Sequence, residues 1–431
     1  MRPRPLVLSL ACLILCDVPA RAAEELQPAN TYGVIVGVLK WEKPTLSSFS
    51  PRHRKDQELY DTLVKRGVPA GNLALLLDEK ATLDAIRRAL RDVAGRAKPG
   101  STFLFYYAGH GSQGGGKVSF CNYDCGAGTP PKPTLALSEV ADILKKHFKG
   151  GRVLLMADCC HSGGLKQVAG DLAKAKINAA SVTSAEASNQ SSGNWTFTQA
   201  VLDALRGEPL VDADGDGSVT LGELVGEVTA GMKYREGQRS GHAYCGVGAD
   251  FRLGRSDRAR RPAATPKDGF ALGSYVLAPD GGKHRPARVV GFAEGKYAVE
   301  FYDYSDKRLA RLPAARLEKI TYKKYKVGQE LQVLWGGRAW KAKVLKAEGD
   351  FHLITYPGWG HEWDEWVLST RVVEGKAGKP AAAEVKWQGQ WYPAVVLKTE
   401  KGKYYIRYVG YDSSWDEWVG KDRIRFPEKK K

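Results

Sequence analysis

Short apolar runs recur through the first half of the chain, and segments with helical periodicity separate them. The runs cover residues 32–38, 73–77, 103–107, 153–157 and, less clearly, 179–182. Nearly uninterrupted apolar runs of this length are typical of strands that are buried on both faces of a parallel sheet. Residues 81–97 and 135–148 place their apolar side chains on one helical face. The alternation predicts an α/β fold, an open sheet flanked by helices.

Two short polar segments directly follow two of these runs. Residues 106–111 read Tyr-Tyr-Ala-Gly-His-Gly, and residues 157–163 read Ala-Asp-Cys-Cys-His-Ser-Gly. The carboxyl ends of parallel strands meet at one edge of an open sheet, where ligands bind, so we expect both segments there. A nucleophilic thiol needs a neighbouring base, because a free thiol is only slightly ionised at neutral pH. Cys160 as nucleophile and His110 as base, 50 residues apart, therefore predict a cysteine peptidase.

The same segments offer backbone donors for the reaction. Attack on an amide carbonyl creates an oxyanion, and each well-placed backbone N–H group is worth roughly 10²–10³ in rate. We expect the N–H group of Cys160 to be one donor. Gly111 follows the base, and its lack of a side chain lets a second backbone N–H group approach the carbonyl.

These segments resemble those of the caspase-like cysteine peptidases, and Asp-Cys-Cys-His-Ser-Gly is similar to the metacaspase and bacterial orthocaspase branch. The resemblance covers residues 31–255 and implies a caspase-like fold and endopeptidase activity. It places the nucleophile at Cys160, directly before His-Ser-Gly, and leaves Cys159 as a packing residue.

The resemblance also implies a substrate pocket. Asp158, two residues before the nucleophile, matches the residue that lines the pocket for the substrate residue before the scissile bond. An anionic pocket prefers Arg or Lys by charge complementarity. Asp56 matches a second pocket carboxylate of the metacaspases, although the Asn and Ala that flank that carboxylate in the family are absent here.

The first residues have the pattern of a secretory signal peptide. Two arginines precede an apolar stretch, and a small-x-small cleavage site follows at residues 20–22. We expect residues 1–22 to be removed and the mature protein, which has no transmembrane segment, to be secreted or periplasmic. Five cysteines remain, and an odd number in an exported protein implies at least one free thiol, which a nucleophile explains. Cys121 and Cys125 either form a local disulfide or stay free.

A segment late in the first region meets the EF-hand consensus over residues 212–223, with Gly217 at its sixth position. The ligand positions hold Asp212, Asp214, Asp216, Ser218, Thr220 and Glu223. These oxygen-bearing residues predict a Ca²⁺ site. The alternative is a tight, hydrogen-bonded acidic turn without a metal ion, because similar turns recur in bacterial caspase-like proteins.

The composition changes after Arg255. Residues 256–270 read as a basic linker that contains proline. From Ser256 to the end, 34 Lys and Arg face 22 Asp and Glu, so +12 of the net charge of +17 lies there. This region also holds nine of the eleven tryptophans. The excess positive charge favours anionic partners.

The tail is repetitive. Five aromatic residues, Trp335, Tyr356, Trp359, Trp363 and Trp366, recur 52 positions later as Trp387, Tyr408, Tyr411, Trp415 and Trp418. A diverged copy precedes them. Alternating apolar and polar runs with Gly and Asp turns predict three small all-β barrels at residues 271–318, 325–373 and 380–427. The last two resemble Tudor-knot or chromo-barrel modules, and the first resembles a Tudor-type barrel.

Trp363, Trp366, Trp415 and Trp418 have two interpretations. Copies of about 45 to 50 residues are close to the lower limit for an independent core, so packing is one role. The other is an aromatic groove that binds a cation or stacks on bases. For an exported protein we expect the barrels to bind an anionic polymer or a protein substrate.

The sequence as a whole supports an exported caspase-like cysteine endopeptidase that cleaves protein or peptide substrates after Arg or Lys. Its barrels would dock the substrate or attach the enzyme to a surface. The alternative is a catalytically inert caspase-like scaffold that binds partners through the barrels.

Overall fold

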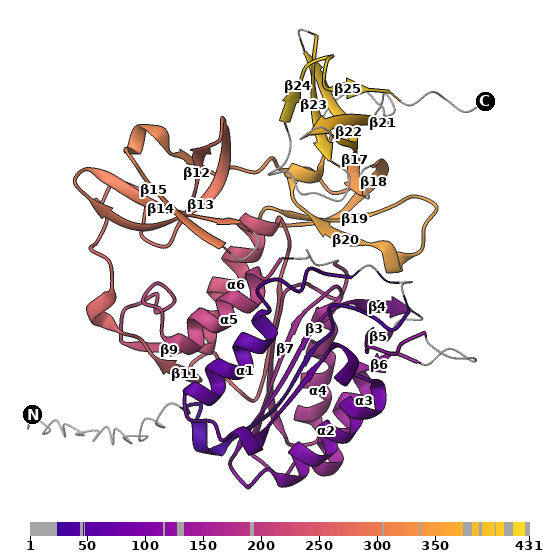
Figure 1. Ribbon diagram of the computed structural model, residues 1–431, viewed down its shortest axis with the longest axis vertical. Coiled ribbons are helices and arrows are strands. Elements are labelled where there is room, and N and C mark those ends of the chain that lie inside the picture. Colours follow the sequence, from indigo (N-terminus) through magenta and orange to yellow (C-terminus); the bar gives the residue numbers. More distant parts are fainter. Residues whose placement is uncertain are drawn as a thin grey trace, which may run out of the picture.

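The structure is a computed structural model. It describes residues 24–43, 46, 48–114, 117–126, 133–189, 194–303, 306–335, 338–373, 382–387, 390–400, 402–408 and 417–426. The expected signal peptide therefore lies outside the described residues. Figure 1 shows a sheet between two groups of helices, with three small β sheets stacked on one side of this first domain. Within the described part of the chain, every helix is too short or too polar to cross a membrane.

A six-stranded sheet forms the centre of the first domain, in the order β10-β8-β7-β3-β1-β2. Its parallel strands are β1 (Thr31–Gly37), β2 (Leu73–Leu77), β3 (Thr102–Ala108), β7 (Arg152–Asp158) and β8 (Asn178–Thr183). The apolar runs predicted these five strands. The antiparallel edge strand β10 (Gly241–Cys245) has no such run, because exposed and buried residues alternate along it.

Helices cover both faces of the sheet (Figure 1). One face carries α1 (Lys55–Lys65), α5 (Thr196–Arg206) and α6 (Leu221–Glu236), and the other carries α2 (Leu83–Arg96), α3 (Leu137–His147) and α4 (Leu165–Lys174). Successive strand residues point to opposite faces, so Tyr107 joins the core under α2, α3 and α4, whereas Tyr106 joins the core under α1, α5 and α6. Burial on both faces explains the uninterrupted apolar runs. The predicted α/β fold is confirmed.

Two smaller sheets complete the first domain. The chain beyond β3 folds into β4 (Gly111–Gly114), β5 (Lys117–Phe120) and β6 (Leu135–Ala136). The pair β9 (Ser218–Thr220) and β11 (Arg252–Arg255) closes the end of the domain. A capping box between Thr220 and Glu223 begins α6, because each residue accepts a backbone hydrogen bond from the other.

The tail forms three antiparallel sheets where the sequence predicted three small all-β barrels. Module 1 contains β12 (Tyr275–Asp280), β13 (Lys283–Ala293), β14 (Lys296–Asp303), β15 (Asp306–Leu312) and β16 (Glu318–Lys319). Module 2 contains β17 (Glu330–Trp335), β18 (Arg338–Glu348), β19 (Phe351–Thr355) and β20 (Glu365–Val367). Module 3 contains β21 (Ala382–Trp387), β22 (Gln390–Glu400), β23 (Lys403–Tyr408), β24 (Glu417–Val419) and β25 (Ile424–Arg425).

The repeat of the last two modules is structural as well as sequential. A β-bulge interrupts the register between Val344 and Lys346 of module 2, and the same bulge occurs between Val396 and Lys398 of module 3. Each of the three modules has its own buried apolar cluster. Each module therefore has its own core, and modules 2 and 3 share the same bulged strand pair.

Modules 1 and 2 dock on α6 and the segment after it. Arg288 of module 1 forms a paired contact with Glu227, at 2.5 and 2.6 Å, and each side chain is only 9% exposed. Lys233 bonds Asp350 of module 2 at 2.6 Å. Arg239 lies 4.0 Å above the ring of Trp366. Because these contacts join charged groups across the interface, the modules are held in a defined position on the first domain.

Candidate active site

The two polar segments leave the sheet side by side. Ala108, the last residue of β3, pairs with Asp158, the last residue of β7, in a parallel register. His110 and Cys160 each lie two residues beyond that pair. The register therefore brings the predicted base and nucleophile to neighbouring positions at the carboxyl edge of the sheet.

Gly111 packs directly against the nucleophile segment. A Cβ atom at this position would lie 1.8 Å from the carbonyl oxygen of Cys160 and 3.2 Å from Sγ of Cys159. Gly109 has a φ of 151°, and a Cβ atom there would lie 2.6 Å from the hydroxyl oxygen of Tyr107. Only glycine fits at these two positions, and the missing side chain of Gly111 allows the two segments to touch.

Aromatic side chains hold His110. The rings of Trp41 and Phe49 each have their centroid 4.6 Å from that of the imidazole. The carbonyl oxygen of His110 accepts hydrogen bonds from the Cys121 N–H group and the Tyr107 hydroxyl, both at 2.9 Å. These contacts fix the position of the imidazole ring. The sequence motifs did not predict Trp41 and Phe49 as site residues, although Trp41 follows β1, whose carboxyl end lies at the same edge.

The two adjacent cysteines differ in solvent exposure. Cys159 is 2% exposed, and burial raises the pKa of its thiol well above the ordinary value. Its N–H group donates to the hydroxyl of Ser184 at 3.1 Å. Cys160 is partly exposed, as a nucleophile must be. The structure holds Cys121 and Cys125 as free thiols, so the alternative of a local disulfide is not realised.

His161, directly after Cys160, has a left-handed backbone with a φ of 57°. Its N–H group donates to the carbonyl oxygen of Asn189 at 2.8 Å, and Nδ1 lies 2.7 Å from the carbonyl oxygen of Ala187. A carbonyl only accepts hydrogen bonds, so Nδ1 carries a proton. A left-handed conformation in a non-glycine residue persists only where the surroundings enforce it, and these two bonds do so.

Asp158 is a buried carboxylate next to the nucleophile. It accepts hydrogen bonds from the N–H group of Thr198 at 3.3 Å and from the hydroxyl of Thr198 at 2.7 Å. Burial raises the pKa of Asp158 to about 7, and the hydrogen bonds from Thr198 and Ser184 oppose this rise. Among the described residues, Asp158 has no ion-pair partner. When it ionises, Asp158 is therefore a carboxylate without a paired cation in the described part of the chain.

Asp56 has a different environment, because the chain supplies its counter-charge. Asp56 is fully buried at the start of α1, and Arg54 donates to its two carboxylate oxygens at 3.1 and 2.6 Å. The same guanidinium also binds Asp78 and the carbonyl oxygen of Gly37. Asp56 is therefore already neutralised by Arg54, a partner that the match of carboxylates alone did not predict.

Three carboxylates of the predicted calcium loop lie close together. One carboxylate oxygen from each of Asp212, Asp214 and Asp216 lies within 4.8 Å of the others. Asp212 accepts from the N–H groups of Gly215 and Gly217, at 2.8 and 3.1 Å. These oxygens are the hard donors that Ca²⁺ prefers.

The other predicted ligands have roles within the fold. Glu223 accepts from the N–H group of Ala213 at 2.7 Å and from that of Thr220 at 2.8 Å. The N–H group of Ser218 donates to Asp216 at 2.7 Å. Arg261 of the linker donates to the carbonyl oxygens of Asp212 and Ala213, so the linker packs onto this loop.

The predicted roles of the four tail tryptophans were core packing or an exposed aromatic groove, and the structure differs from one tryptophan to the next. Trp366 is 9% exposed and packs in an apolar cluster with Phe351 and Leu368. Trp363 and Trp418 are 39% and 41% exposed. Trp415 lies outside the described residues. Packing therefore accounts for Trp366, whereas Trp363 and Trp418 present ring surface to solvent.

Two parts of the chain match known families. Residues 55–255 match the caspase domain family. Residues 381–426 match the Tudor-knot family, described by its RNA-binding activity as the knot of a chromodomain. The chain therefore contains a caspase domain and, towards its end, a Tudor-knot domain. No curated protein matches the chain.

Three solved structures resemble parts of the chain. Caspase-1 from Spodoptera frugiperda is 14% identical, with 55% of this chain and 96% of that chain covered and a TM-score of 0.34. The Drosophila initiator caspase Dronc is 8% identical, with 54% and 88% covered and a TM-score of 0.35. The AGD34 part of AGDP1 from Arabidopsis thaliana is 16% identical, with 23% and 81% covered and a TM-score of 0.12.

Proposed function

We propose that this protein is a cysteine endopeptidase that cleaves protein substrates after Arg or Lys. The observation that carries the proposal is the register of β3 and β7, which brings His110 and Cys160 to neighbouring strand ends. The close packing of Gly111 on the backbone of Cys160 supports it.

The reaction uses groups that this edge of the sheet brings together. The thiolate of Cys160 attacks the carbonyl carbon, and His110 takes the thiol proton and passes it to the leaving amine. The backbone N–H groups of Gly111 and Cys160 stabilise the oxyanion. Water then hydrolyses the thioester, with His110 as the base. The ring contacts of Trp41 and Phe49 support the position of the imidazole during this cycle.

Specificity rests mainly on Asp158. Its carboxylate is buried beside the nucleophile and lacks an ionic partner among the described residues, so an Arg or Lys side chain would supply the missing charge. Asp56 contributes through its ion pair with Arg54 rather than as a free carboxylate. We therefore assign the primary recognition of the basic residue to Asp158.

Fluorogenic peptides that end in Arg, Lys or Asp before the reporter group test the proposal. We expect wild-type protein to cleave the Arg and Lys peptides and the Cys160→Ala variant to cleave none of them. A preference for Asp would contradict the pocket assignment. If no peptide is cleaved, with or without Ca²⁺, the chain is an inert scaffold instead.

We also propose that the chain is exported and that its modules dock protein substrates or a surface polymer. The amino-terminal pattern supports export, and the match to the Tudor-knot family supports binding. Mass spectrometry of the protein from its native host tests export, because the mature chain should begin near Ala23. An intact Met1 on the native protein would contradict it.

Residues 212–223 are a proposed Ca²⁺ site, supported by the gathered carboxylates of Asp212, Asp214 and Asp216. Bound Ca²⁺ would neutralise these like charges and stabilise the start of α6. We expect Ca²⁺ to raise the thermal midpoint of wild-type protein and to have no effect on Asp214→Asn combined with Asp216→Asn. Equal midpoints with Ca²⁺ and with chelator in wild-type protein would favour the metal-free turn.

A further inference from the structure

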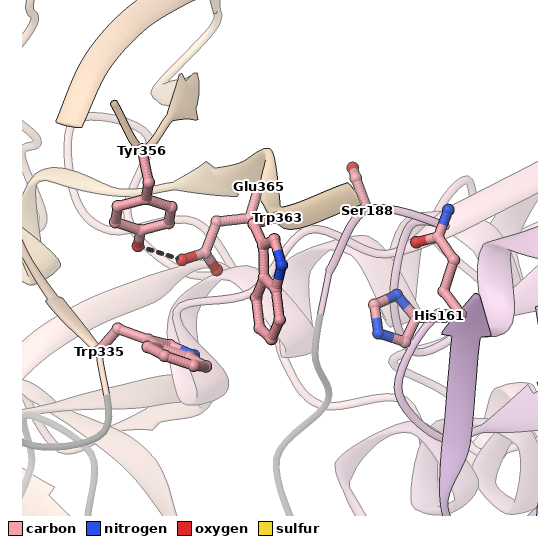
Figure 2. Close-up of a pocket in the computed structure, with 7 residues that line it drawn as sticks. His161, Ser188, Trp335, Tyr356, Trp363 and Glu365 are labelled. Atoms are coloured by element: carbon pink, nitrogen blue, oxygen red, sulfur yellow. Dashed lines mark hydrogen bonds between the residues drawn. The ribbon is translucent and has the colours of Figure 1, made fainter. Parts of the chain in front are cut away.

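Residues 184–189, named here the bridging segment, follow β8 and lie between module 2 and the nucleophile segment, residues 157–163. Figure 2 shows His161 and Ser188 of the caspase domain on one side of a pocket, with Trp363 of module 2 on the other. Module 2 therefore meets the caspase domain close to the candidate nucleophile, and the bridging segment forms part of that meeting point.

The bridging segment holds the nucleophile segment on both sides of Cys160. Before Cys160, the N–H group of Cys159 donates to the hydroxyl of Ser184 at 3.1 Å. After it, the N–H group of His161 donates to the backbone carbonyl oxygen of Asn189 at 2.8 Å. Because both neighbours of Cys160 are bonded to this one segment, the direction in which the thiol points depends on where the bridging segment lies.

Asn189 also fixes the bridging segment to module 2. Its side-chain amide donates to the carbonyl oxygen of Trp366 in β20 at 2.9 Å, and its side-chain oxygen accepts from the N–H group of Trp366 at 3.4 Å. Asn189 is only 3% exposed, so these bonds satisfy polar groups that water cannot reach. The side chain of Asn189 therefore binds module 2, while its backbone binds His161.

Arg239 makes a second connection between the same two parts. Its guanidinium lies 4.0 Å above the ring of Trp366 and donates to Glu348 of module 2 at 2.8 Å. The same group lies 3.5 Å from the carboxylate of Glu186 in the bridging segment, and the N–H group of Glu186 donates to the carbonyl oxygen of Arg239 at 3.0 Å. Module 2 therefore reaches the bridging segment at two points, directly at Asn189 and through Arg239 at Glu186.

We propose that module 2 positions the nucleophile, with Asn189 as the positioning residue between them. Strand β20 holds the side chain of Asn189, the backbone of Asn189 holds His161, and His161 is bonded covalently to Cys160. Asn189 then acts through the position of the thiol relative to His110, and a misplacement of about 1 Å costs an enzyme on the order of 10²-fold in rate. This inference rests on the proposed peptidase function and makes module 2 a part of the active-site framework.

Asn189→Ala tests the inference because it removes both bonds to Trp366 and keeps the backbone of the bridging segment. We expect kcat for an Arg peptide to fall by about tenfold or more and KM to stay within about twofold, because the thiol moves while the specificity pocket stays in place. Lys233→Ala is the matched control, since it breaks a different contact of module 2, the 2.6 Å pair of Lys233 with Asp350. It should keep kcat within about twofold.

Alkylation of Cys160 by iodoacetamide tests the same inference without a substrate. The reagent attacks thiolates, and mass spectrometry with fragmentation measures the label on Cys160 separately from Cys159. We expect Asn189→Ala to shift the midpoint of the rate–pH profile upwards and to slow the reaction at pH 7 several-fold, because the thiol lies farther from His110. Lys233→Ala should keep the wild-type profile. A chain that cleaves no peptide still gives this measurement, so failure of the proposed function is distinct from failure of the inference.

Two outcomes would overturn the inference. One is an Asn189→Ala variant with wild-type kcat and a wild-type alkylation profile. The other is an equal loss in Asn189→Ala and Lys233→Ala, because weaker docking of the whole module would then explain the effect. Circular dichroism and the thermal midpoint show whether each variant folds. If Asn189→Ala does not fold, Arg239→Gln tests the same connection by removing the contacts with Glu186 and Glu348, and unchanged kcat and alkylation in this variant would overturn the inference.

Discussion

At the scale of single residues, the adjacent cysteines have opposite environments. Cys159 is buried and its thiol has a raised pKa, whereas Cys160 is partly exposed. We expect Cys160→Ala to lower kcat/KM for an Arg peptide by at least about 10³-fold, because the nucleophile is lost. Cys159→Ala should stay within about threefold, because only packing changes. Steady-state assays of both variants check this, and a large loss in Cys159→Ala alone would reverse the assignment.

The raised pKa of Asp158 makes the free energy of unfolding depend on pH. Burial raises its pKa in the folded protein to about 7, from an ordinary value of 3.8, so the folded state holds this proton more tightly than the unfolded chain. The contribution of this bound proton to the free energy of unfolding is fully present below about pH 4. It is lost as the pH rises through about 7.

Asp158→Asn removes the cost of ionising this buried group. We expect the variant to be more stable than wild-type protein at pH 8, by on the order of a few kcal/mol, and the difference to shrink at pH 5. Urea unfolding at both pH values measures it. Asp142→Asn changes an exposed carboxylate on α3, which is 71% exposed, and should give little difference at either pH. A variant less stable than wild type at pH 8 would contradict the burial argument.

At the scale of elements, the ends of β3 and β7 act together. Their contact depends on Gly111, where a Cβ atom would lie 1.8 Å from the carbonyl oxygen of Cys160. We expect Gly111→Ala to displace the nucleophile segment and to lower kcat by about 100-fold or more, the scale of one oxyanion donor. Gly114→Ala has open space around its added Cβ and is the matched control. Equal activities of the two variants would show that the close contact is unimportant for catalysis.

At the scale of the whole molecule, buried charge pairs hold the modules on the caspase domain. Arg288→Ala would leave Glu227 buried without its partner, and breaking such a pair costs about 3–5 kcal/mol. We expect a clear fall in the thermal midpoint and faster proteolysis at the junction between module 1 and α6. Arg425→Ala breaks an exposed pair with Glu384 in module 3 and should change little. An unchanged midpoint for Arg288→Ala would mean that other contacts hold the module.

Much of the architecture was predictable from local pattern. Hydrophobic periodicity predicted the five parallel strands, the helices at residues 81–97 and 135–148, and the three β regions of the tail. It does so because a buried face requires apolar residues at regular spacing. The two polar segments after β3 and β7 were predictable for a related reason. Strand ends in a parallel sheet meet at one edge, so sequence position alone places them together.

Other features depended on contacts between residues distant in sequence, which leave no local pattern. Arg54 neutralises Asp56, and the rings of Trp41 and Phe49 hold His110. Asn189 bonds module 2 across 177 residues of chain. The sequence by itself therefore determined the fold class, the candidate nucleophile and base, and the repeat. Only the tertiary structure decided which of the two carboxylates lacks an ion-pair partner among the described residues, and that module 2 lies beside the nucleophile segment, because packing of whole elements sets those distances.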